Sequence, residues 1–287
     1  MYPASFDYST PTTIDEALRL LSEHGENAKV LAGGHSLLPL MKLRFAQPTH
    51  VVDLRRIPSL RGIRRDGDTL VIGAMTTHAE LAASADVRDA APIIADAASQ
   101  IGDPQVRNRG TIGGSLAHAD PSADLPAVIL ALGATIVAAG PAGRRSIRAD
   151  EFFRELFTTS LNADELLAEV RIPVSTARSG SAYAKHAQPA SRFAYVGVAA
   201  ALDLERMGEH VQRVRVAVTG FANTPLRAIK VEEALLGRVA DADTIAVASM
   251  ELDGGSELND DTEAAYKVQL ARVCVDIALR RATERAR

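Results

Sequence analysis

The sequence predicts an α+β protein whose C-terminal part forms a separate layer of sheet and helices. Two observations predict this class. Short apolar segments alternate with amphipathic helical segments as far as residue 173, and two long β-rich segments, at 193–204 and 211–219, then precede a run of helical segments. Between the two parts lies Val174–Ser181, which is rich in Ser, Gly and Ala and has the composition of a linker.

The first expected unit begins with a helix. Thr13 and Glu16 have the spacing of a capping box, Ile14, Leu18 and Leu21 form one apolar stripe, and a glycine at position 25 ends the helix. The other expected elements are a strand at 28–31, a Gly-Gly turn at 33–34, a helix at 37–43 and a strand at 50–54. Together they form a compact strand–turn–helix–strand unit.

From about residue 55 the pattern of expected strands and helices changes. We expect strands at 70–73 and 169–173, helices at 79–83 and 92–101, and a second Gly-Gly loop within 111–115. The stretch Leu125–Gly143 carries no charge and is nominally long enough to span a membrane, but it contains two prolines and three glycines. We therefore interpret it as a buried helix (126–132) followed by a buried strand (134–139), and we expect a soluble, cytoplasmic protein.

The C-terminal part is expected to hold two long strands, 193–204 and 211–219, joined by a polar turn around 207–210. Helices should follow at 225–236, 240–250 and 262–286. In the last helix Tyr266, Leu270, Val273 and Ile277 keep helical spacing, and arginines near its end suit the negative pole of the helix dipole.

Composition excludes several functions. The net charge of −4 gives no basic excess for nucleic-acid binding. Cys274 is the only cysteine, so the chain has no internal disulfide and no cysteine-ligated iron–sulfur cluster or zinc finger. Cys274 could be a nucleophile, but a small buried apolar residue in a helix is the favoured interpretation. The first ten residues show no signal-peptide pattern.

Two glycine pairs are the main functional signal. Gly33-Gly34 and Gly113-Gly114 are each followed by a hydroxyl residue, Ser36 or Ser115. Adjacent glycines allow positive φ and let a backbone approach a ligand closely, and successive N–H groups form a concavity suited to phosphate. Two such sites indicate a pyrophosphate held from both sides. Neither pair matches the dinucleotide fingerprint or the P-loop, so a tight turn remains the alternative for each.

Longer segments around these pairs carry a family resemblance. AGGHSLLPLMKLR (32–44), its continuation FAQP (45–48), and GDPQVRNRGTIGGSLAHADPSADLPA (102–127) resemble the flavoprotein subunit of molybdenum-containing carbon monoxide dehydrogenases, and more broadly the FAD domain of the xanthine dehydrogenase family. The resemblance covers essentially the whole chain. It implies a vanillyl-alcohol-oxidase (PCMH) type FAD-binding fold of two subdomains, 1–55 and 56–175, with a C-terminal domain at 176–287.

The resemblance also implies site residues. Those expected at the pyrophosphate are Ala32, Gly33, Gly34, His35, Ser36, Thr111, Gly113, Gly114 and Ser115, the last where the family usually has Asn. Ile101 would lie along the flavin or its ribityl chain, and Leu161 or Leu166 near the adenine.

Three further positions have an alternative explanation. Asp124 would contact the ribose of the adenosine half, or it could cap a helix beginning at Pro126. Lys185 would lie close to the isoalloxazine ring, or it could be a surface lysine on an edge strand. Phe193 aligns with the aromatic residue, usually Tyr or Trp, that covers the flavin face, and Tyr195 lies close by.

No catalytic or metal-binding residue is predicted. Some relatives of this fold attach flavin through histidine, but the resemblance favours non-covalent FAD over attachment to His35. His118, Asp120 and Asp124 could mimic a metal or acid–base cluster, and a polar loop lining a cofactor is the favoured alternative.

The function that the resemblance implies is electron transfer within a larger complex. Substrate would be oxidised on a molybdenum-containing large subunit, and electrons would pass over [2Fe-2S] clusters of a small subunit to FAD and then to an external acceptor. A dimer of heterotrimers is expected, with possible peripheral membrane association. Carbon monoxide is the first choice of substrate, and xanthine, aldehydes and N-heteroaromatics are alternatives. A self-sufficient FAD oxidoreductase and a flavin-free scaffold are the competing hypotheses.

Overall fold

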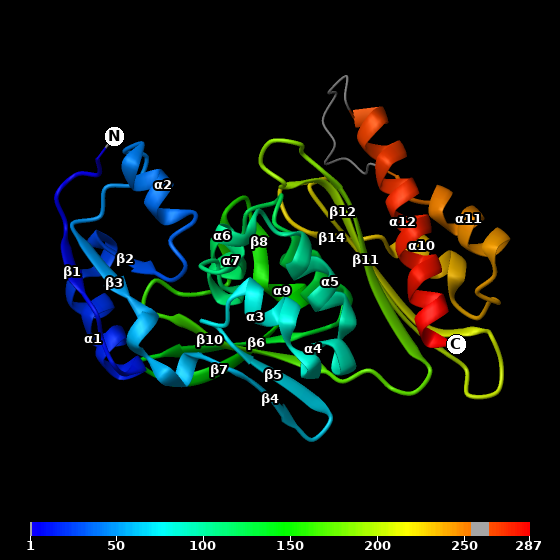
Figure 1. Ribbon diagram of the computed structural model, residues 1–287, viewed down its shortest axis with the longest axis horizontal. Helices are drawn as coiled ribbons and strands as arrows, with labels where there is room; N and C mark the ends of the chain where they lie inside the picture. Colours follow the sequence, from blue (N-terminus) through cyan, green and yellow to red (C-terminus); the bar gives the residue numbers. More distant parts are fainter. Residues whose placement is uncertain (1, 254–263) are drawn as a thin grey trace.

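The computed structural model describes residues 2–253 and 264–287. Within them the strands form sheets of three, five and four strands and one small two-stranded sheet. Figure 1 shows the N-terminal sheet at one end of the long axis, the five-stranded sheet with its helices in the middle, and the C-terminal sheet and helices at the other end. The α+β class predicted from the sequence is confirmed.

The N-terminal unit is a three-stranded parallel sheet in the order β1 (Asp7–Ser9), β3 (His50–Asp53), β2 (Ala28–Leu31). Helix α1 (Ile14–His24) begins as predicted, because the Thr13 hydroxyl accepts a hydrogen bond from the Glu16 amide. Its buried stripe faces this sheet, and Gly25 ends it with φ of 52°. Helix α2 (Leu37–Lys42) follows β2. Strand β1 was not predicted.

The middle unit is a five-stranded antiparallel sheet. Its order is β4 (Ile63–Asp66), β5 (Thr69–Gly73), β10 (Leu166–Pro173), β6 (Thr135–Gly140), β7 (Gly143–Arg148). The sequence analysis found β5, β6 and β10, because these strands are apolar and buried. It missed the hairpin partners β4 and β7, whose side chains are mostly charged and exposed.

Helices cover one face of this sheet (Figure 1). They are α3 (His78–Ala83), α4 (Ala85–Ala90), α5 (Pro92–Gln100), α6 (Pro104–Arg107), α7 (Ile112–His118) and α8 (Asp124–Ala131). Every residue of α8 is buried, because α8 lies between the middle sheet and the C-terminal sheet. The uncharged stretch is thus a buried helix and strand, as predicted. The shorter elements are η1 (Gly25–Asn27), η2 (Leu54–Arg56), η3 (Pro58–Leu60), α9 (Ala149–Phe152), β8 (Phe153–Glu155) and β9 (Thr158–Thr159).

The C-terminal unit is an antiparallel sheet, β11 (Ser179–Ala187), β12 (Ala194–Leu204), β13 (Val211–Thr219) and β14 (Leu226–Arg227). Side chains alternate across it. Val196 and Val198 of β12 join the core under α10 (Ile229–Leu235), α11 (Ala242–Met250) and α12 (Ala264–Ala286), whereas Ala199 joins the core of the middle unit. One sheet therefore connects two hydrophobic cores.

Two predictions about this unit are corrected. Strand β11 begins at Ser179, so the expected linker 174–181 is shorter, and the expected helix 225–236 begins with β14. The predicted start of the last helix, 262–263, lies outside the described residues. Cys274 is buried in α12, as the favoured interpretation predicted.

In helix α12 the predicted stripe of Tyr266, Val273 and Ile277 is exposed, whereas Val275 and Leu279 are buried with several alanines. Tyr266 and Val273 are 56% and 47% exposed, while Ala271, Ala278 and Ala282 are buried. The helix lies so close to β11 that a Cβ at Gly180 would come within 1.8 Å of the Ala282 carbonyl oxygen. Small residues are therefore required at the interface with the sheet. Among the described helices, none is both long and apolar enough to cross a bilayer.

Candidate functional site

A cavity of about 620 Å³ lies where the N-terminal unit meets the helices of the middle unit. This volume is in the range of small-molecule and cofactor sites. Of the residues expected to bind the cofactor, all but Lys185 line it: Ala32, Gly33, Gly34, His35, Ser36, Ile101, Thr111, Gly113, Gly114, Ser115, Asp124, Leu161, Leu166 and Phe193. The structure thus brings together segments that are far apart in the sequence.

The first glycine motif leaves hydrogen-bond donors free. Gly34 has φ of +81°, which favours glycine, and it turns the chain from β2 into α2. Within the described part of the chain, the backbone amides of Gly34, His35 and Ser36 have no hydrogen-bond partner, nor does the Ser36 hydroxyl. Consecutive unpartnered amides at a cavity wall are suited to an anion.

The second glycine motif is not an open loop, which corrects the sequence-based prediction. Gly113 and Gly114 lie in the first turn of α7, and their amides donate to the Ala74 carbonyl at 2.8 Å and the Thr111 hydroxyl at 3.1 Å. The Ile112 amide donates to the Thr76 carbonyl. The Ser115 hydroxyl has no hydrogen-bond partner among the described residues.

The glycines also have a different steric role from the expected one. A Cβ at Gly33 would lie 2.3 Å from the Arg109 carbonyl oxygen and 2.7 Å from the Cα of Gly110. A Cβ at Gly113 would lie 2.5 Å from that of Ala74. These positions are glycine because two backbone segments pack directly on each other. The packing places the first motif against the segment that leads into α7.

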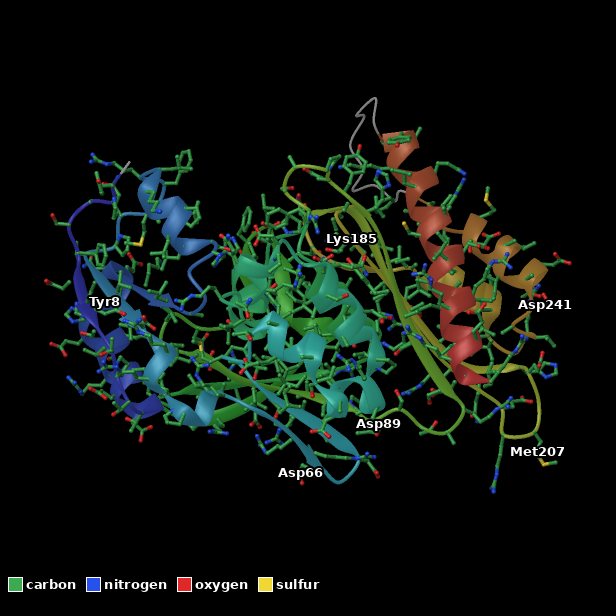
Figure 2. All side chains as sticks on the ribbon, viewed as in Figure 1. Tyr8, Asp66, Asp89, Lys185, Met207 and Asp241 are labelled. Atoms are coloured by element: carbon green, nitrogen blue, oxygen red, sulfur yellow. The ribbon has the colours of Figure 1, made fainter. Side chains whose placement is uncertain are left out.

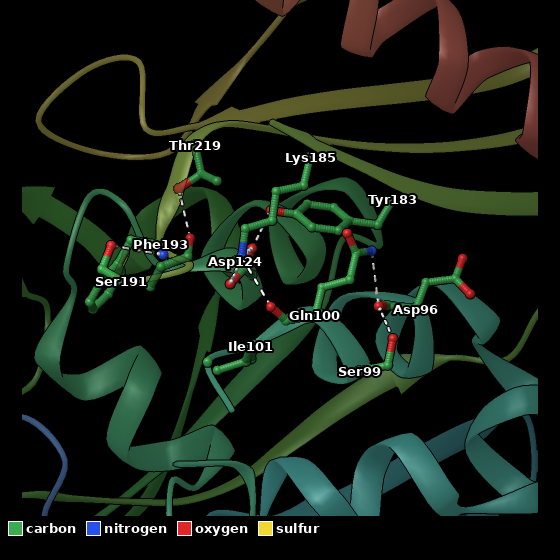
Figure 3. A network of polar contacts seen from close by, with 12 residues as sticks. Asp96, Ser99, Gln100, Ile101, Asp124, Tyr183, Lys185, Ser191, Phe193 and Thr219 are labelled. Atoms are coloured by element: carbon green, nitrogen blue, oxygen red, sulfur yellow. Dashed lines mark hydrogen bonds and ion pairs between the residues drawn. The ribbon is translucent and has the colours of Figure 1, made fainter. Parts of the chain in front are cut away.

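Behind the cavity, Asp124, Tyr183 and Lys185 form a buried polar cluster (Figure 3). The Lys185 ammonium lies 2.8 Å from Oδ1 of Asp124 and donates to the Gln100 carbonyl at 3.3 Å. The Tyr183 hydroxyl donates to the same carboxylate at 2.6 Å. A Cβ at Gly197 would lie 2.1 Å from this hydroxyl, so the glycine makes room for it. The cluster joins β11 of the C-terminal sheet to α8.

This cluster overturns two of the alternative explanations. Asp124 is not a helix cap, since α8 begins at Asp124 itself and the capping position is Ala123. Lys185 is not a surface residue, although β11 is an edge strand. Its side chain is 1% exposed and lies in the interior, whereas Asp66, Asp89 and Met207 project from the periphery (Figure 2).

Burial dominates the electrostatics of the cluster. It raises the pKa of the Asp124 carboxyl, and the nearby Lys185 ammonium opposes that rise. Burial and the neighbouring carboxylate raise the pKa of the Tyr183 hydroxyl well above its usual value. Tyr183 is therefore a permanent hydrogen-bond donor to Asp124 at physiological pH.

The remaining predicted residues are also placed by the structure. The side chains of Ile101, Leu161 and Leu166 form part of the apolar wall of the cavity. Both leucines that were candidates for the adenine contact therefore line it. Phe193 lines the cavity and is 45% exposed, whereas Tyr195 packs near Tyr266 in the C-terminal core. Of the two aromatic candidates, Phe193 is the one at the cavity.

His78 and Phe157 are two of the cavity residues that the sequence analysis did not single out. His78 was a single scattered histidine there, but its side chain is 4% exposed and lines the cavity. Burial lowers its pKa to about 4, and the charge of His35 acts in the same direction. Phe157 also lines the cavity, with φ of +56° and its ring 5.1 Å from that of His118. Only the capping box Thr77–Glu80, after a predicted strand, could have marked position 78 as the start of a helix.

His118, Asp120 and Asp124 do line one cavity, but Asp124 is paired with Lys185. In residues 2–253 and 264–287 no three His, Cys, Asp or Glu side chains are grouped so that they could hold a metal ion.

Comparison with known proteins gives matches over the whole chain. Residues 4–175 match the model of the FAD binding domain in molybdopterin dehydrogenase, and residues 181–282 match that of the CO dehydrogenase flavoprotein C-terminal domain. The carbon monoxide dehydrogenase medium chain of Hydrogenophaga pseudoflava is 42% identical, over 99% of both chains. The 6-hydroxypseudooxynicotine dehydrogenase complex subunit alpha of Paenarthrobacter nicotinovorans is 38% identical, over 100% of this chain and 97% of that one. In a solved structure of the Hydrogenophaga pseudoflava carbon monoxide dehydrogenase, one chain superposes with a TM-score of 0.94 at 44% identity, covering 99% of both chains.

Proposed function

The chain belongs to the family of FAD-binding subunits of molybdopterin dehydrogenases, and from this premise we propose that it is the FAD-carrying electron-transfer subunit of a molybdenum hydroxylase complex. The observation that carries the proposal is the row of unpartnered amides at Gly34, His35 and Ser36 on the wall of a cofactor-sized cavity. It agrees with the family resemblance found in the sequence.

The residues of the cavity fit FAD. The amides of the first motif, with the hydroxyls of Ser36 and Ser115, would hold the pyrophosphate. Apolar side chains at Ile101, Leu161 and Leu166, and the ring of Phe193, would contact the ring systems. When bound, FAD supplies the ability to accept and release electrons in one- and two-electron steps. Asp124 reaches the cavity and is held by Tyr183 and Lys185, so its carboxylate is available to a ribose hydroxyl.

The proposed partner subunits are inferred from the number of cysteines in this chain. A single cysteine cannot ligate an iron–sulfur cluster, and that cysteine is buried in α12 with a thiol pKa raised by burial. We therefore place [2Fe-2S] clusters on a small partner subunit and the molybdenum cofactor on a large one. We propose a cytoplasmic dimer of heterotrimers, with possible peripheral membrane contact through the complex.

The proposed division of the chain is 1–55, 56–175 and 176–287. Each part contains one of the three larger sheets, which supports the division. Carbon monoxide is the proposed substrate of the complex. The other relative compared above acts, by its name, on a different compound, so xanthine, aldehydes and N-heteroaromatics are the alternatives.

Stopped-flow spectroscopy tests the proposal. The chain expressed alone with FAD should be yellow, and acid precipitation should release all of the flavin. Mixing it with CO, xanthine or aldehydes should leave the oxidised flavin band unbleached, while the assembled complex bleaches with its substrate. Rapid bleaching of the isolated chain by any of them would support a self-sufficient oxidoreductase instead. A colourless folded chain that binds no FAD would support a flavin-free scaffold.

A further inference from the structure

His78 is a cavity-lining residue whose ring has no polar partner. It begins α3, and its backbone amide donates to the Gly110 carbonyl at 3.0 Å. Its side chain is buried and lines the cavity. Within residues 2–253 and 264–287, neither ring nitrogen makes a hydrogen bond, and Nδ1 is fully enclosed by protein atoms. A buried polar atom without a partner calls for an explanation.

The enclosed Nδ1 determines which nitrogen carries the proton. An N–H group buried without an acceptor is rarer in proteins than an acceptor without a donor. The proton of the neutral ring should therefore be on Nε2. Burial keeps the ring neutral by lowering its pKa to about 4, and no carboxylate acts on the ring to oppose this. His78 thus offers one N–H donor over the physiological pH range.

Nε2 lies beside the segment that connects the two glycine motifs. A Cβ at Gly110 would be 2.9 Å from Nε2, and a Cβ at Gly33 would be 2.7 Å from the Cα of the same Gly110. Gly33 of the first motif and the ring of His78 therefore both pack against Gly110, and His78 lines the same cavity as the unpartnered amides. Donors that converge on one part of a cavity indicate an anionic ligand group there.

We propose that His78 is a further cofactor-binding residue, whose Nε2–H donates a hydrogen bond to a phosphate oxygen of the bound dinucleotide. This inference rests on the proposed function, because it takes FAD as the occupant of the cavity. The hydrogen bond joins a neutral donor to a charged acceptor, and its loss should weaken binding roughly ten- to hundredfold.

Three substitutions separate this role from a structural one. In His78→Gln the side-chain amide nitrogen can reach the position of Nε2, whereas in His78→Asn it can reach only that of Nδ1, and His78→Leu has no donor. The dissociation constants of FAD and of ADP, which has the pyrophosphate without the flavin, are measured on the flavin-free full chain by fluorescence and calorimetry. We expect the Asn and Leu variants to lose roughly ten- to hundredfold affinity for both probes, and the Gln variant to keep most of it. Equal affinity of the Asn variant and the wild type would overturn the inference.

The tautomer gives a readout independent of affinity. In ¹⁵N-histidine-labelled protein, the His78 signal, assigned by its loss in His78→Gln, should be that of a neutral ring protonated at Nε2. Addition of ADP should move this proton downfield. A ring protonated at Nδ1, or a proton that does not respond to ADP, would contradict the inference. A wild-type chain that binds neither FAD nor ADP would overturn the proposed function as well, whereas normal wild-type binding with an unaffected Asn variant overturns only the role of His78.

Discussion

Replacing Lys185 by methionine removes one charge from the buried cluster and leaves the other. The side chains of Lys185 and Asp124 are 1% and 4% exposed, and their charged atoms are 2.8 Å apart. Methionine has a similar length, so the main loss is electrostatic. Asp124 keeps only the Tyr183 hydroxyl as a partner among the side chains described. Breaking a buried ion pair by removing one partner costs about 3–5 kcal/mol of unfolding free energy, because the remaining charge is buried without compensation.

Urea unfolding of the flavin-free chain at pH 7 measures this cost. Lys185→Met should be destabilised by about 3–5 kcal/mol, and the double variant Lys185→Met/Asp124→Asn should recover a large part of it, because no charge is then buried. The exposed pair Arg19–Glu23 on α1 is the matched control. Arg19→Met should cost no more than about 0.5 kcal/mol, as expected for an exposed pair one helical turn apart.

The destabilisation should also depend on pH. Without Lys185 the folded-state pKa of Asp124 lies further above the unfolded value of about 3.9. A carboxyl with a raised folded pKa contributes stability below the unfolded pKa and loses it as the pH rises through the folded pKa. The difference between Lys185→Met and the wild type should therefore shrink as the pH falls from 7 and be smallest below pH ~4. A cost under about 1 kcal/mol at pH 7, or additive single and double variants, would refute the reasoning.

Three further predictions follow from the packing and burial of single residues. Gly33→Ala should lower FAD affinity and stability together, because its Cβ would lie 2.3 Å from the Arg109 carbonyl oxygen; an unchanged urea midpoint would contradict this. Gly197→Ala should be strongly destabilising in the wild type and less so in a Tyr183→Phe background, because the Cβ would lie 2.1 Å from the Tyr183 hydroxyl; equal costs in both backgrounds would exclude the steric cause. Stability should fall by roughly 3 kcal/mol as the pH drops from about 6.5 to about 4, because the unfolded His78 takes up a proton that the folded one excludes; His78→Gln should lack this part of the pH profile.

The sequence alone determined the features that depend on local chemistry. The capping box at Thr13, the buried β-rich segments and the uncharged stretch around α8 are local patterns, and the structure has the elements they predict. The glycine motifs lie in long, specific segments, so the family could be recognised from them, and the comparisons confirm it. The role of each recognised residue at FAD stays a prediction.

Tertiary structure decided which donors are free and which side chains are buried. The sequence gives Gly33-Gly34 and Gly113-Gly114 the same appearance, yet only the first pair leaves its neighbouring amides unpartnered, because the second packs against the strand end at Ala74. Lys185 on an edge strand is expected to be exposed, but α5 packs on β11 and Asp124 of α8 pairs with the Lys185 ammonium.

The same reason explains the two clearest misses. His78 is an ordinary helix-start residue in the sequence, and it becomes a buried cavity residue only because Gly110, far along the chain, packs against its ring. The predicted stripe Tyr266, Val273 and Ile277 of α12 is exposed, and the face that packs on β11 has alanines where Gly180 approaches, with Val275 and Leu279 also buried. Periodicity identifies a helix and its apolar positions, but the distance to the neighbouring element decides which of those positions are buried, and that distance is fixed by residues remote in the sequence.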